Sequence, residues 1–321
     1  MRVALVTCLD MPRPDADLPI LERAFAERGA CAEIVPWEDA GVAWDAFDAV
    51  LVRSTWNYVG RYREFHAWID RVAAATRLLN PRGALLWNLH KRYLAELAAA
   101  GIDVVPTEVV LHGVDPDWES LFARFGDLVV KPAVSAGSFA TIRVRRGDVA
   151  AARAHRMAHL ERDLLVQPLL ASVVAHGETN LVHFGGRFSH AIHKGARWDG
   201  DAEQSRGVVQ PEADELALAT RVLAYVEAHG RGVHGRGVHG WGVHGWGVHG
   251  WDVHGWDVHG WDVHGWDGGA LAYARVDMAR GADGRPLLME LEIVEPSLFL
   301  DRAPAQASML VDAVLGAAAR G

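Results

Sequence analysis

The sequence predicts a mixed α/β and α+β fold built from three consecutive units in a chain of 321 residues. Near the N-terminus, short apolar runs alternate with helical patterns, which is typical of a parallel sheet covered by helices. Further along, apolar runs follow one another with fewer helices between them, which favours α+β structure. A domain takes about 100 to 200 residues, so this length suggests roughly two to three units. We place the units at 1–85, 86–170 and 171–321.

The first unit is predicted to be a parallel α/β layer. Glycine and proline mark where its elements stop, because glycine closes helices and proline interrupts both helices and central strands. The expected order is a strand at 2–8, a helix at 18–29 that ends at Gly29, strands at 31–36 and 48–55, a helix through Trp68 to Ala75, and a strand at 77–80 before Pro81.

The second unit is expected to open with one helix over 88–101, with Asn88 as its N-cap and Gly101 at its end. Apolar runs indicate the strands that follow, and amphipathic spacing indicates two further helices. The strands are expected at 107–111, 127–132, 139–144 and 163–170, and the helices near 116–125 and 148–160.

The third unit should begin with a β-hairpin, because two strand patterns flank Gly185 and Gly186. A second pair of strands surrounds the segment GADGRP, which has the composition of a turn. The expected elements are the hairpin at 180–195, a helix at 212–228, strands at 271–280 and 287–296, and a closing helix from about 303.

A tandem repeat of eight pentapeptides, from HGRGV to HGWDG, interrupts the third unit at 229–268. A period of five fits neither a helical stripe nor one face of a strand. We therefore interpret this Gly/His/Trp repeat as a loop inserted between a helix and a strand, where insertions cost little free energy. Binding of Zn, Cu or Ni by its histidines, and self-association through its tryptophans, remain alternatives to a loop without function.

Composition and charge restrict the kind of partner. Half of the residues are hydrophobic, and 32 basic against 41 acidic residues give a net charge of −9, which argues against nucleic acid. No apolar run approaches the ~20 residues that cross a bilayer, and the N-terminus lacks an apolar signal core, so we expect a cytoplasmic protein without a membrane partner. Cys8 and Cys31 form no C-x-x-C pattern, which predicts neither disulfides nor a cysteine metal site.

The strand predicted at 287–296, LLMELEIVEP, carries carboxylates within an apolar run. Because side chains alternate along a strand, Glu290 and Glu292 lie on one face, while Leu291 and Ile293 lie on the other. Two neighbouring carboxylates repel each other, and their burial is costly unless a cation compensates them. The pattern therefore indicates a metal site. A strand at the sheet edge with a solvated polar face is the alternative that this segment alone leaves open.

The preceding strand supplies matching groups. Arg275 and Asp277 lie two residues apart on one strand face, and the GADG turn folds this strand back toward the next. If the strands pair, Asp277, Glu290 and Glu292 converge, with Arg275 at the rim. Hard oxygen ligands without cysteine favour Mg²⁺ or Mn²⁺ over zinc.

A phosphate-binding element is suggested by the segment LVVKPAVSAGSFAT, because the chain has no Walker loop. Lys131 ends a hydrophobic strand, and the small residues of 135–140 follow it. A loop of this composition can lay backbone N–H groups over phosphates.

Five spaced motifs together resemble the ATP-grasp ligases and cover about 86–301: NLHKRYL, VVKPAVSAGSFAT, LVQPLL, YARVD and MELEIVEPSLFL. Within that superfamily the chain is similar to the glutathione-synthetase-like branch and to its subgroup containing the cyclo-ligase of cycloserine biosynthesis. The resemblance implies three subdomains: an N-terminal substrate domain and two further parts that hold ATP between them. The central part, 86–170, would be the lid, and the part at 171–321 would carry the repeat.

The resemblance also implies roles for residues that match the family motifs. Lys91 and Lys131 would contact the ATP phosphates, and Arg275 would stabilise the transferring phosphoryl group. Asp277, Glu290 and Glu292 would bind Mg²⁺, although many relatives have Asn at the position of Glu292. The remaining ATP contacts would come from Ser135, Gly137 and Ser138 in the lid loop, from Gln167 and Leu169 at the adenine hinge, and from Glu178 at the ribose.

Substrate residues are less fully marked by the sequence. Arg53 lies at the end of a strand of the first unit and Asn57 follows it, where α/β folds usually bind ligands, so we expect Arg53 or Asn57 to hold the substrate. Packing by the neighbouring Trp56 and Tyr58 is the alternative interpretation of this segment. Lys194 and Arg206 loosely match the family's substrate and phosphate loop.

The implied reaction is the joining of a small carboxylate to an amine. The carboxylate would attack the γ-phosphate of ATP to give an acyl phosphate and ADP, and an amine would then displace phosphate to form an amide. Two alternatives remain: a nucleotide-binding protein without ligase turnover, and a metal-binding or interaction protein that acts through the HGWDV repeat. A homo-oligomer is compatible with each.

Overall fold

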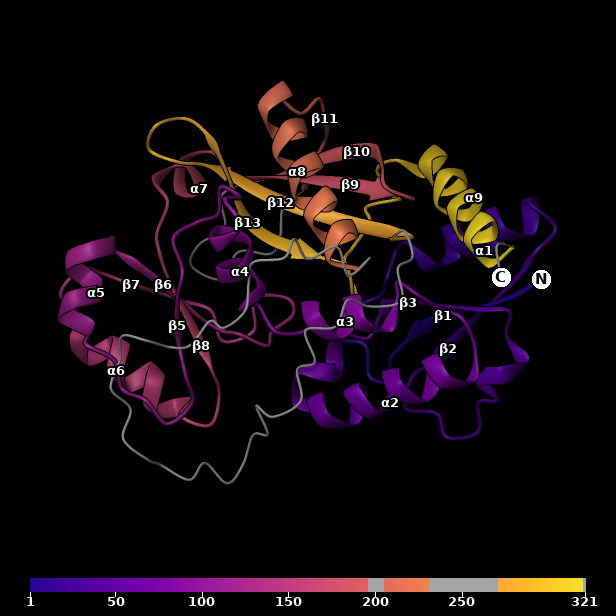
Figure 1. Ribbon diagram of the computed structural model, residues 1–321, viewed down its shortest axis with the longest axis horizontal. Coiled ribbons are helices and arrows are strands. Elements are labelled where there is room, and N and C mark those ends of the chain that lie inside the picture. The colour runs from indigo at the N-terminus through magenta and orange to yellow at the C-terminus, as the bar shows by residue number, and fades with distance from the viewer. Residues whose placement is uncertain (196–204, 231–270, 320–321) are drawn as a thin grey trace.

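The computed structural model describes residues 1–195, 205–230 and 271–319, and these residues form three β-sheets (Figure 1). The first sheet is parallel, with the strand order β2-β1-β3-β4. Its strands are β1 (Arg2–Thr7), β2 (Cys31–Pro36), β3 (Ala49–Ser54) and β4 (Leu78–Leu79). Strands β1 and β3 are apolar and almost wholly buried, which is typical of a parallel sheet covered on both faces. The predicted parallel layer is confirmed.

Helices cover this sheet through apolar stripes. In α2 (Tyr62–Ala75), Phe65, Trp68, Ile69 and Val72 are buried at helical spacing. On the other face, α1 (Leu18–Glu27) shares an apolar cluster with the C-terminal helix α9 (Ala307–Ala318). The two helices lie side by side in Figure 1, so the end of the chain packs against its beginning. Short 3-10 helices complete this layer: η1 (Trp44–Ala46), η2 (Trp56–Gly60) and, before α9, η3 (Pro304–Gln306).

The second sheet is antiparallel, with the order β5-β8-β6-β7. Its helices α5 (Trp118–Phe125) and α6 (Val149–Ala158) begin at aspartates that accept a backbone N–H: Asp117 from Ser120, and Asp148 from Ala151. The strands are β5 (Glu108–Val110), β6 (Leu128–Pro132), β7 (Ile142–Val144) and β8 (Leu164–Pro168).

The single helix predicted over 88–101 is wrong. The chain forms α3 (Arg82–Asn88) and α4 (Tyr93–Ala99), with a break between them. Asn88 caps no helix, because its side-chain amide donates to Leu291 O at 2.8 Å and accepts from Ile293 N at 3.1 Å. In the break, Lys91 N donates to Ala133 O. Bonds to two distant strands therefore replace the helical bonds that would have joined α3 to α4.

The third sheet is antiparallel, with the order β11-β10-β9-β12-β13. The predicted hairpin at Gly185 and Gly186 joins β9 to β10, and the predicted strand pair around the GADG turn is also present. The strands are β9 (Glu178–Phe184), β10 (Arg187–Lys194), β11 (Ser205–Val209), β12 (Tyr273–Arg280) and β13 (Pro286–Glu292), with helices α7 (Ala171–Ala175) and α8 (Ala213–Gly230).

The pentapeptide repeat lies outside the described residues, apart from its first two positions at the end of α8. The elements on either side of the repeat, α8 and β12, lie next to each other. Leu223 and Glu227 of α8 line a small cavity of about 10 Å³ together with Leu271 and Tyr273 at the start of β12. The repeat therefore joins two points that already lie close together, as a loop insertion requires.

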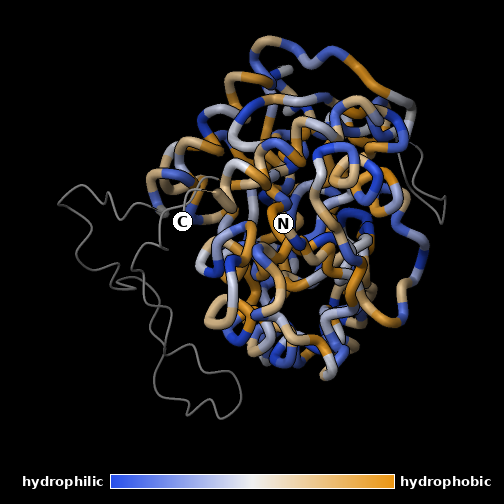
Figure 2. The backbone as a smooth tube through the Cα atoms, turned by 90° about the vertical axis from the view of Figure 1, so that its right-hand side faces the viewer, coloured by the Kyte–Doolittle hydropathy of each residue, from blue (hydrophilic) through white to orange (hydrophobic). Residues whose placement is uncertain are grey.

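Apolar segments run through the interior of the backbone trace, whereas polar segments mark its outer loops (Figure 2). In the described part of the chain, no helix combines the length and the apolar composition that a membrane crossing needs.

Candidate active site

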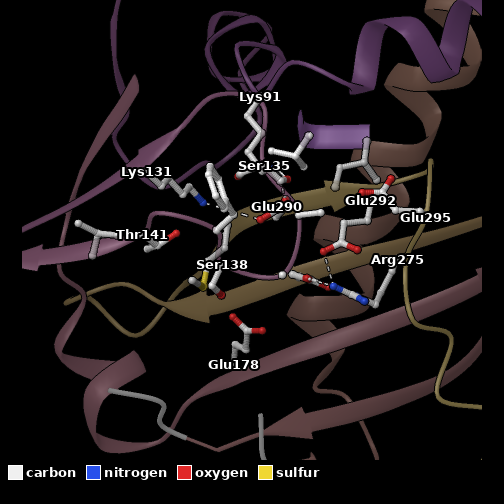
Figure 3. Close-up of a pocket in the computed structure, with 18 of the residues that line it drawn as sticks. Lys91, Lys131, Ser135, Ser138, Thr141, Glu178, Arg275, Glu290, Glu292 and Glu295 are labelled. Atoms are coloured by element: carbon white, nitrogen blue, oxygen red, sulfur yellow. Dashed lines mark hydrogen bonds and ion pairs between the residues drawn. The ribbon is translucent and has the colours of Figure 1, made fainter. Parts of the chain in front are cut away.

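A cavity of about 870 Å³ lies where the three sheets meet. The N-terminal layer contributes Trp56 and Tyr58 to its lining, and the central sheet contributes Lys131 and Gln167. The third sheet contributes its acids and an arginine, which Figure 3 shows pointing toward one another from β12 and β13. Concave sites of this size that gather polar groups from several elements are the usual places for ligand binding.

The strand register places the predicted acidic residues together. Asp277 lies opposite Glu290, and Arg275 lies opposite Glu292. The buried guanidinium of Arg275 donates to both carboxylate oxygens of Asp277 at 2.8 Å each and also to Glu292. Arg275 further donates to Ser297 O at 3.1 Å. One guanidinium is thus shared between two carboxylates, a geometry that suits arginine because its donors form a planar fork.

Two lysines lie on the other side of this group. Lys91 Nζ lies 3.0 Å from Glu290 Oε1, and Lys131 Nζ lies 3.8 Å from Glu290 Oε2. Lys91 also donates to Ser135 O at 2.6 Å, which ties the start of the small-residue loop to this site. Burial by itself lowers the pKa of Lys91, but Glu290 together with Glu295 and Glu292 outweighs burial and raises it. Lys91 is therefore charged, as a phosphate contact would require.

The carboxylates differ in their pKa values. Burial acts to raise the pKa of Glu290, but Lys91 and Lys131 outweigh it and lower the pKa. Burial likewise acts against ionisation of Asp277, but Arg275 together with Lys194 and Asn180 overcomes it, so this pKa is also lowered. For Glu292, burial with the repulsion of Asp277 and Glu290 outweighs Arg275, and the pKa rises to about 8. Although Glu292 contacts Arg275, the single guanidinium does not compensate both acids.

This donor set fits a hard divalent cation chemically. Its members are all oxygens, and an added cation would offset the repulsion that raises the pKa of Glu292. Among the described residues, however, no three acidic, histidine or cysteine side chains already stand in a metal-binding arrangement. The protein's own cations lie among the acids instead, so a bound metal would have to take over part of the role of Arg275 or Lys91.

The loop after Lys131 has an unusual backbone. Gly137, Ser138 and Ala140 have φ values of 59°, 62° and 50°. Residues other than glycine rarely adopt this left-handed conformation, and they do so mainly at functional sites. Ser135 and Ser138 line the cavity together with Gly137, and the neighbouring Phe139 is exposed. The predicted lid loop therefore borders the cavity.

The residues predicted for adenine and ribose also line the cavity, but their polar groups have internal partners. Gln167 Nε2 donates to Thr107 Oγ1 at 2.8 Å, and Leu169 N donates to Asp127 O at 2.8 Å. Glu178 Oε1 lies 3.3 Å from Lys194 Nζ. Lys194 therefore faces Glu178 across β9 and β10 and lines the cavity with it.

The predicted substrate residues do not all line the cavity. Arg53 is completely buried and does not line the cavity, since its guanidinium donates to Pro296 O at 2.8 Å and to Asp17 at 3.3 Å. Asn57 borders the cavity, but its amide oxygen accepts from Trp37 Nε1 at 2.8 Å and its nitrogen donates to Glu38. The side chain of Arg206 lies outside the described part of the structure.

Several residues that position the site were not predicted. Tyr93 Oη donates to Leu291 O at 2.9 Å and accepts from Leu291 N at 3.0 Å, so it holds the backbone between Glu290 and Glu292 together with Asn88. Glu295 also lines the cavity, three residues beyond Glu292. The signal for Glu295 was present in the sequence as a carboxylate at the end of an apolar strand, whereas nothing local marks Tyr93.

Comparison with known proteins decides the family. Residues 3–80 match the family described as D-cycloserine synthetase DcsG, N-terminal domain. Over 314 residues, the chain is 36% identical to the cycloserine biosynthesis protein DcsG of Streptomyces lavendulae, covering 93% of this chain and 92% of that protein. The chain belongs to the DcsG family. This DcsG-family chain also superposes on the crystal structure of D-cycloserine synthetase DcsG with a TM-score of 0.81 at 34% identity, covering 99% of this chain and 100% of that one.

A more distant structure extends the comparison of folds. The RimK domain ATP-grasp protein of Sphaerobacter thermophilus has a TM-score of 0.62 at 21% identity and covers 98% of the DcsG-family chain and 100% of its own. At that identity the likeness concerns the fold alone. The predicted ATP-grasp fold is thereby confirmed, and the DcsG-family chain is an ATP-dependent carboxylate–amine ligase.

Proposed function

We propose that this ligase uses ATP and Mg²⁺ to activate the carboxylate of a small amino-acid-like substrate as an acyl phosphate and then forms an amide within it or with a second amine. The observation that carries the proposal is the register of β12 against β13, which brings Arg275 and Asp277 onto Glu292 and Glu290. A product like that named for its relatives, D-cycloserine, is the first to test.

The proposal divides the chain into an N-terminal substrate unit at 1–85, a central lid unit at 86–170 and a C-terminal unit at 171–321. The cavity that supports this division is lined from all three. Gln167 and Leu169 would border the adenine, Glu178 would hold the ribose, and Ser135, Gly137 and Ser138 would cover the phosphates. Lys194 and Arg206 would lie toward the phosphates and the substrate. Arg53, being buried, would act by positioning Pro296, and Asn57 would border the substrate.

In the first step, a carboxylate oxygen of the substrate attacks the γ-phosphorus of ATP, and the bond from that phosphorus to the bridging oxygen of the β-phosphate breaks. ADP leaves, and the substrate becomes an acyl phosphate. Lys91, Lys131 and Arg275 would neutralise the charge that moves between the oxygens, since phosphoryl transfer depends on positioning and charge compensation. Mg²⁺ held by Asp277, Glu290 and Glu292 would supply further charge neutralisation when bound.

In the second step, an amine nitrogen attacks the acyl carbon. The bond to the phosphate oxygen breaks, inorganic phosphate leaves, and the nitrogen loses a proton to give the amide. Arg275 is the cavity-lining arginine of β12, and its guanidinium could stabilise the oxyanion that forms at the acyl carbon.

Hydroxylamine trapping tests this function. With a competent acid, ATP and Mg²⁺, the protein should release ADP and yield a hydroxamate, because hydroxylamine intercepts an acyl phosphate. Glu290→Ala should lower both signals by at least about 100-fold, since it removes the carboxylate that faces both lysines. Glu64→Ala, at an exposed carboxylate on α2, serves as the control and should change neither. Binding of ATP without any ADP release or hydroxamate would favour the nucleotide-binding alternative instead.

Excision of residues 231–268 with a short linker tests whether the repeat has a role. Because Leu223 and Glu227 already lie against Leu271, closing the gap should not strain the fold. We expect ligase turnover within about twofold of the full chain and a similar melting temperature, since loop length affects stability only weakly. Zinc and nickel binding should be measured by calorimetry in both chains. Loss of turnover together with loss of metal binding would support the alternative in which the repeat is the working part.

A further inference from the structure

Among the described residues, one carboxylate that lines the cavity forms no ion pair with a lysine or arginine. Glu290 has Lys91 and Lys131, Asp277 and Glu292 share Arg275, and Glu178 has Lys194. Glu295 also lines the cavity, but none of the ion pairs between described residues includes it. Figure 3 shows its side chain beyond Glu292, at the end of the acidic group.

Glu295 is held in place from the N-terminal layer. Trp56 Nε1 donates to the backbone oxygen of Glu295 at 3.1 Å. The hydroxyl of Tyr58 lies near enough to the Glu295 carboxylate to act against the rise in its pKa. The ring of Tyr58 is buried and stacks on Phe65 with the centroids 5.0 Å apart. The backbone of Glu295 is therefore held beside a packed aromatic ring before any ligand arrives, which suits a binding group.

The charge at this end of the cavity is unbalanced. Burial raises the pKa of Glu295 to about 7, against the opposing effect of Lys91, which already pairs with Glu290. A cation brought by a ligand would compensate this carboxylate in the way that the lysines compensate Glu290. Arg275 also acts electrostatically on Glu295, so its guanidinium lies within range of this carboxylate.

We propose that Glu295, supported by Tyr58, binds the ammonium group of an α-amino-acid substrate whose carboxylate faces Arg275. The assignment rests on the proposed ligase function and adds the residue that recognises the free amino group of the amino-acid-like substrate. Lys91 and Lys131 lie on the phosphate side, whereas Tyr58 and Trp56 enclose the amino group. Glu295 is then a specificity residue for the substrate and not a ligand of the metal.

The test uses two probes, D-cycloserine and isoxazolidin-3-one, which is the same ring without the amino group. Each is titrated by calorimetry into the full chain saturated with ADP and Mg²⁺. The wild-type protein should bind D-cycloserine more tightly. Glu295→Gln keeps the shape of the side chain and should weaken D-cycloserine binding about 10- to 100-fold, as expected for a lost hydrogen bond to a charged group. It should leave isoxazolidin-3-one and ADP within about twofold.

Two further variants separate binding from folding. Tyr58→Phe keeps the ring and should weaken D-cycloserine binding by less than Glu295→Gln, while Glu295→Asp should recover part of the affinity. Equal affinity of the wild type for the two probes, binding of neither, or an equal loss of both in Glu295→Gln would overturn the assignment of Glu295. The assignment would also be overturned if Glu295→Gln changed the affinity for Mg²⁺ but still bound D-cycloserine more tightly than isoxazolidin-3-one by the wild-type ratio. Failure of the wild type to bind ADP with Mg²⁺ would overturn the ligase function itself.

Discussion

Replacing Arg275 by methionine should lower kcat by roughly 100- to 1000-fold, the usual effect of losing one group that stabilises developing negative charge. The same change should destabilise the fold by about 3–5 kcal/mol in EDTA, because Asp277 and Glu292 would lose their shared partner inside the protein. Methionine fills a similar volume, so loss of packing contributes little. Turnover by ADP release and unfolding in urea measure the two effects.

Two variants make the Arg275 result specific. Arg280→Met lies on the same strand, but Arg280 pairs with Asp214 away from the cavity and should change kcat by less than twofold. Arg275→Lys restores the charge without the planar fork, so it should recover more stability than rate. If Arg275→Met kept kcat within tenfold of the wild type, the arginine would be a structural counter-ion for Asp277 and no more.

The acidic site was predictable because its parts are local. A period of two placed Glu290 and Glu292 on one face, and a short turn fixed which residues of the preceding strand lie opposite them. The register of Asp277 with Glu290 is therefore determined within a single hairpin. The lysine at the end of the strand at 127–132, Lys131, followed from the same kind of pattern, because the polar end of an apolar strand is visible without knowing the fold.

What the sequence did not reveal depends on contacts between distant segments. Asn88 is a residue type that often caps helices, but its side chain bonds to the backbone of Leu291 and Ile293 instead. Arg53 lies at the end of a strand as a ligand contact would, but it is buried and pairs with Asp17 instead. Pairings across 36, 203 and 205 residues leave no periodicity in the sequence, so local patterns cannot distinguish a binding group from a structural one in these cases.

Gly177→Ala should destabilise the protein more than the same change at Gly60 or Gly137, which also line the cavity. Gly177 precedes Glu178 with a φ of 93°, and a Cβ built there would lie 1.9 Å from the backbone oxygen of Lys194. Backbone cannot move aside as a side-chain tip can, so β9 and β10 would have to separate where Glu178 faces Lys194. We expect a loss of about 4 kcal/mol or more, and weaker ATP binding, since a forced backbone shift adds to left-handed strain.

Gly29→Ala provides the matched control for that prediction. Gly29 also has a positive φ, 71°, but no atom lies within 4 Å of the added Cβ. It should therefore cost only the conformational strain of about 1–2 kcal/mol and leave ATP binding unchanged. The difference between the two variants in urea unfolding isolates the close approach of Gly177 to Lys194. Equal destabilisation by the two changes would mean that β9 and β10 can separate freely at this end, and that Glu178 is not held rigidly where the ribose would bind.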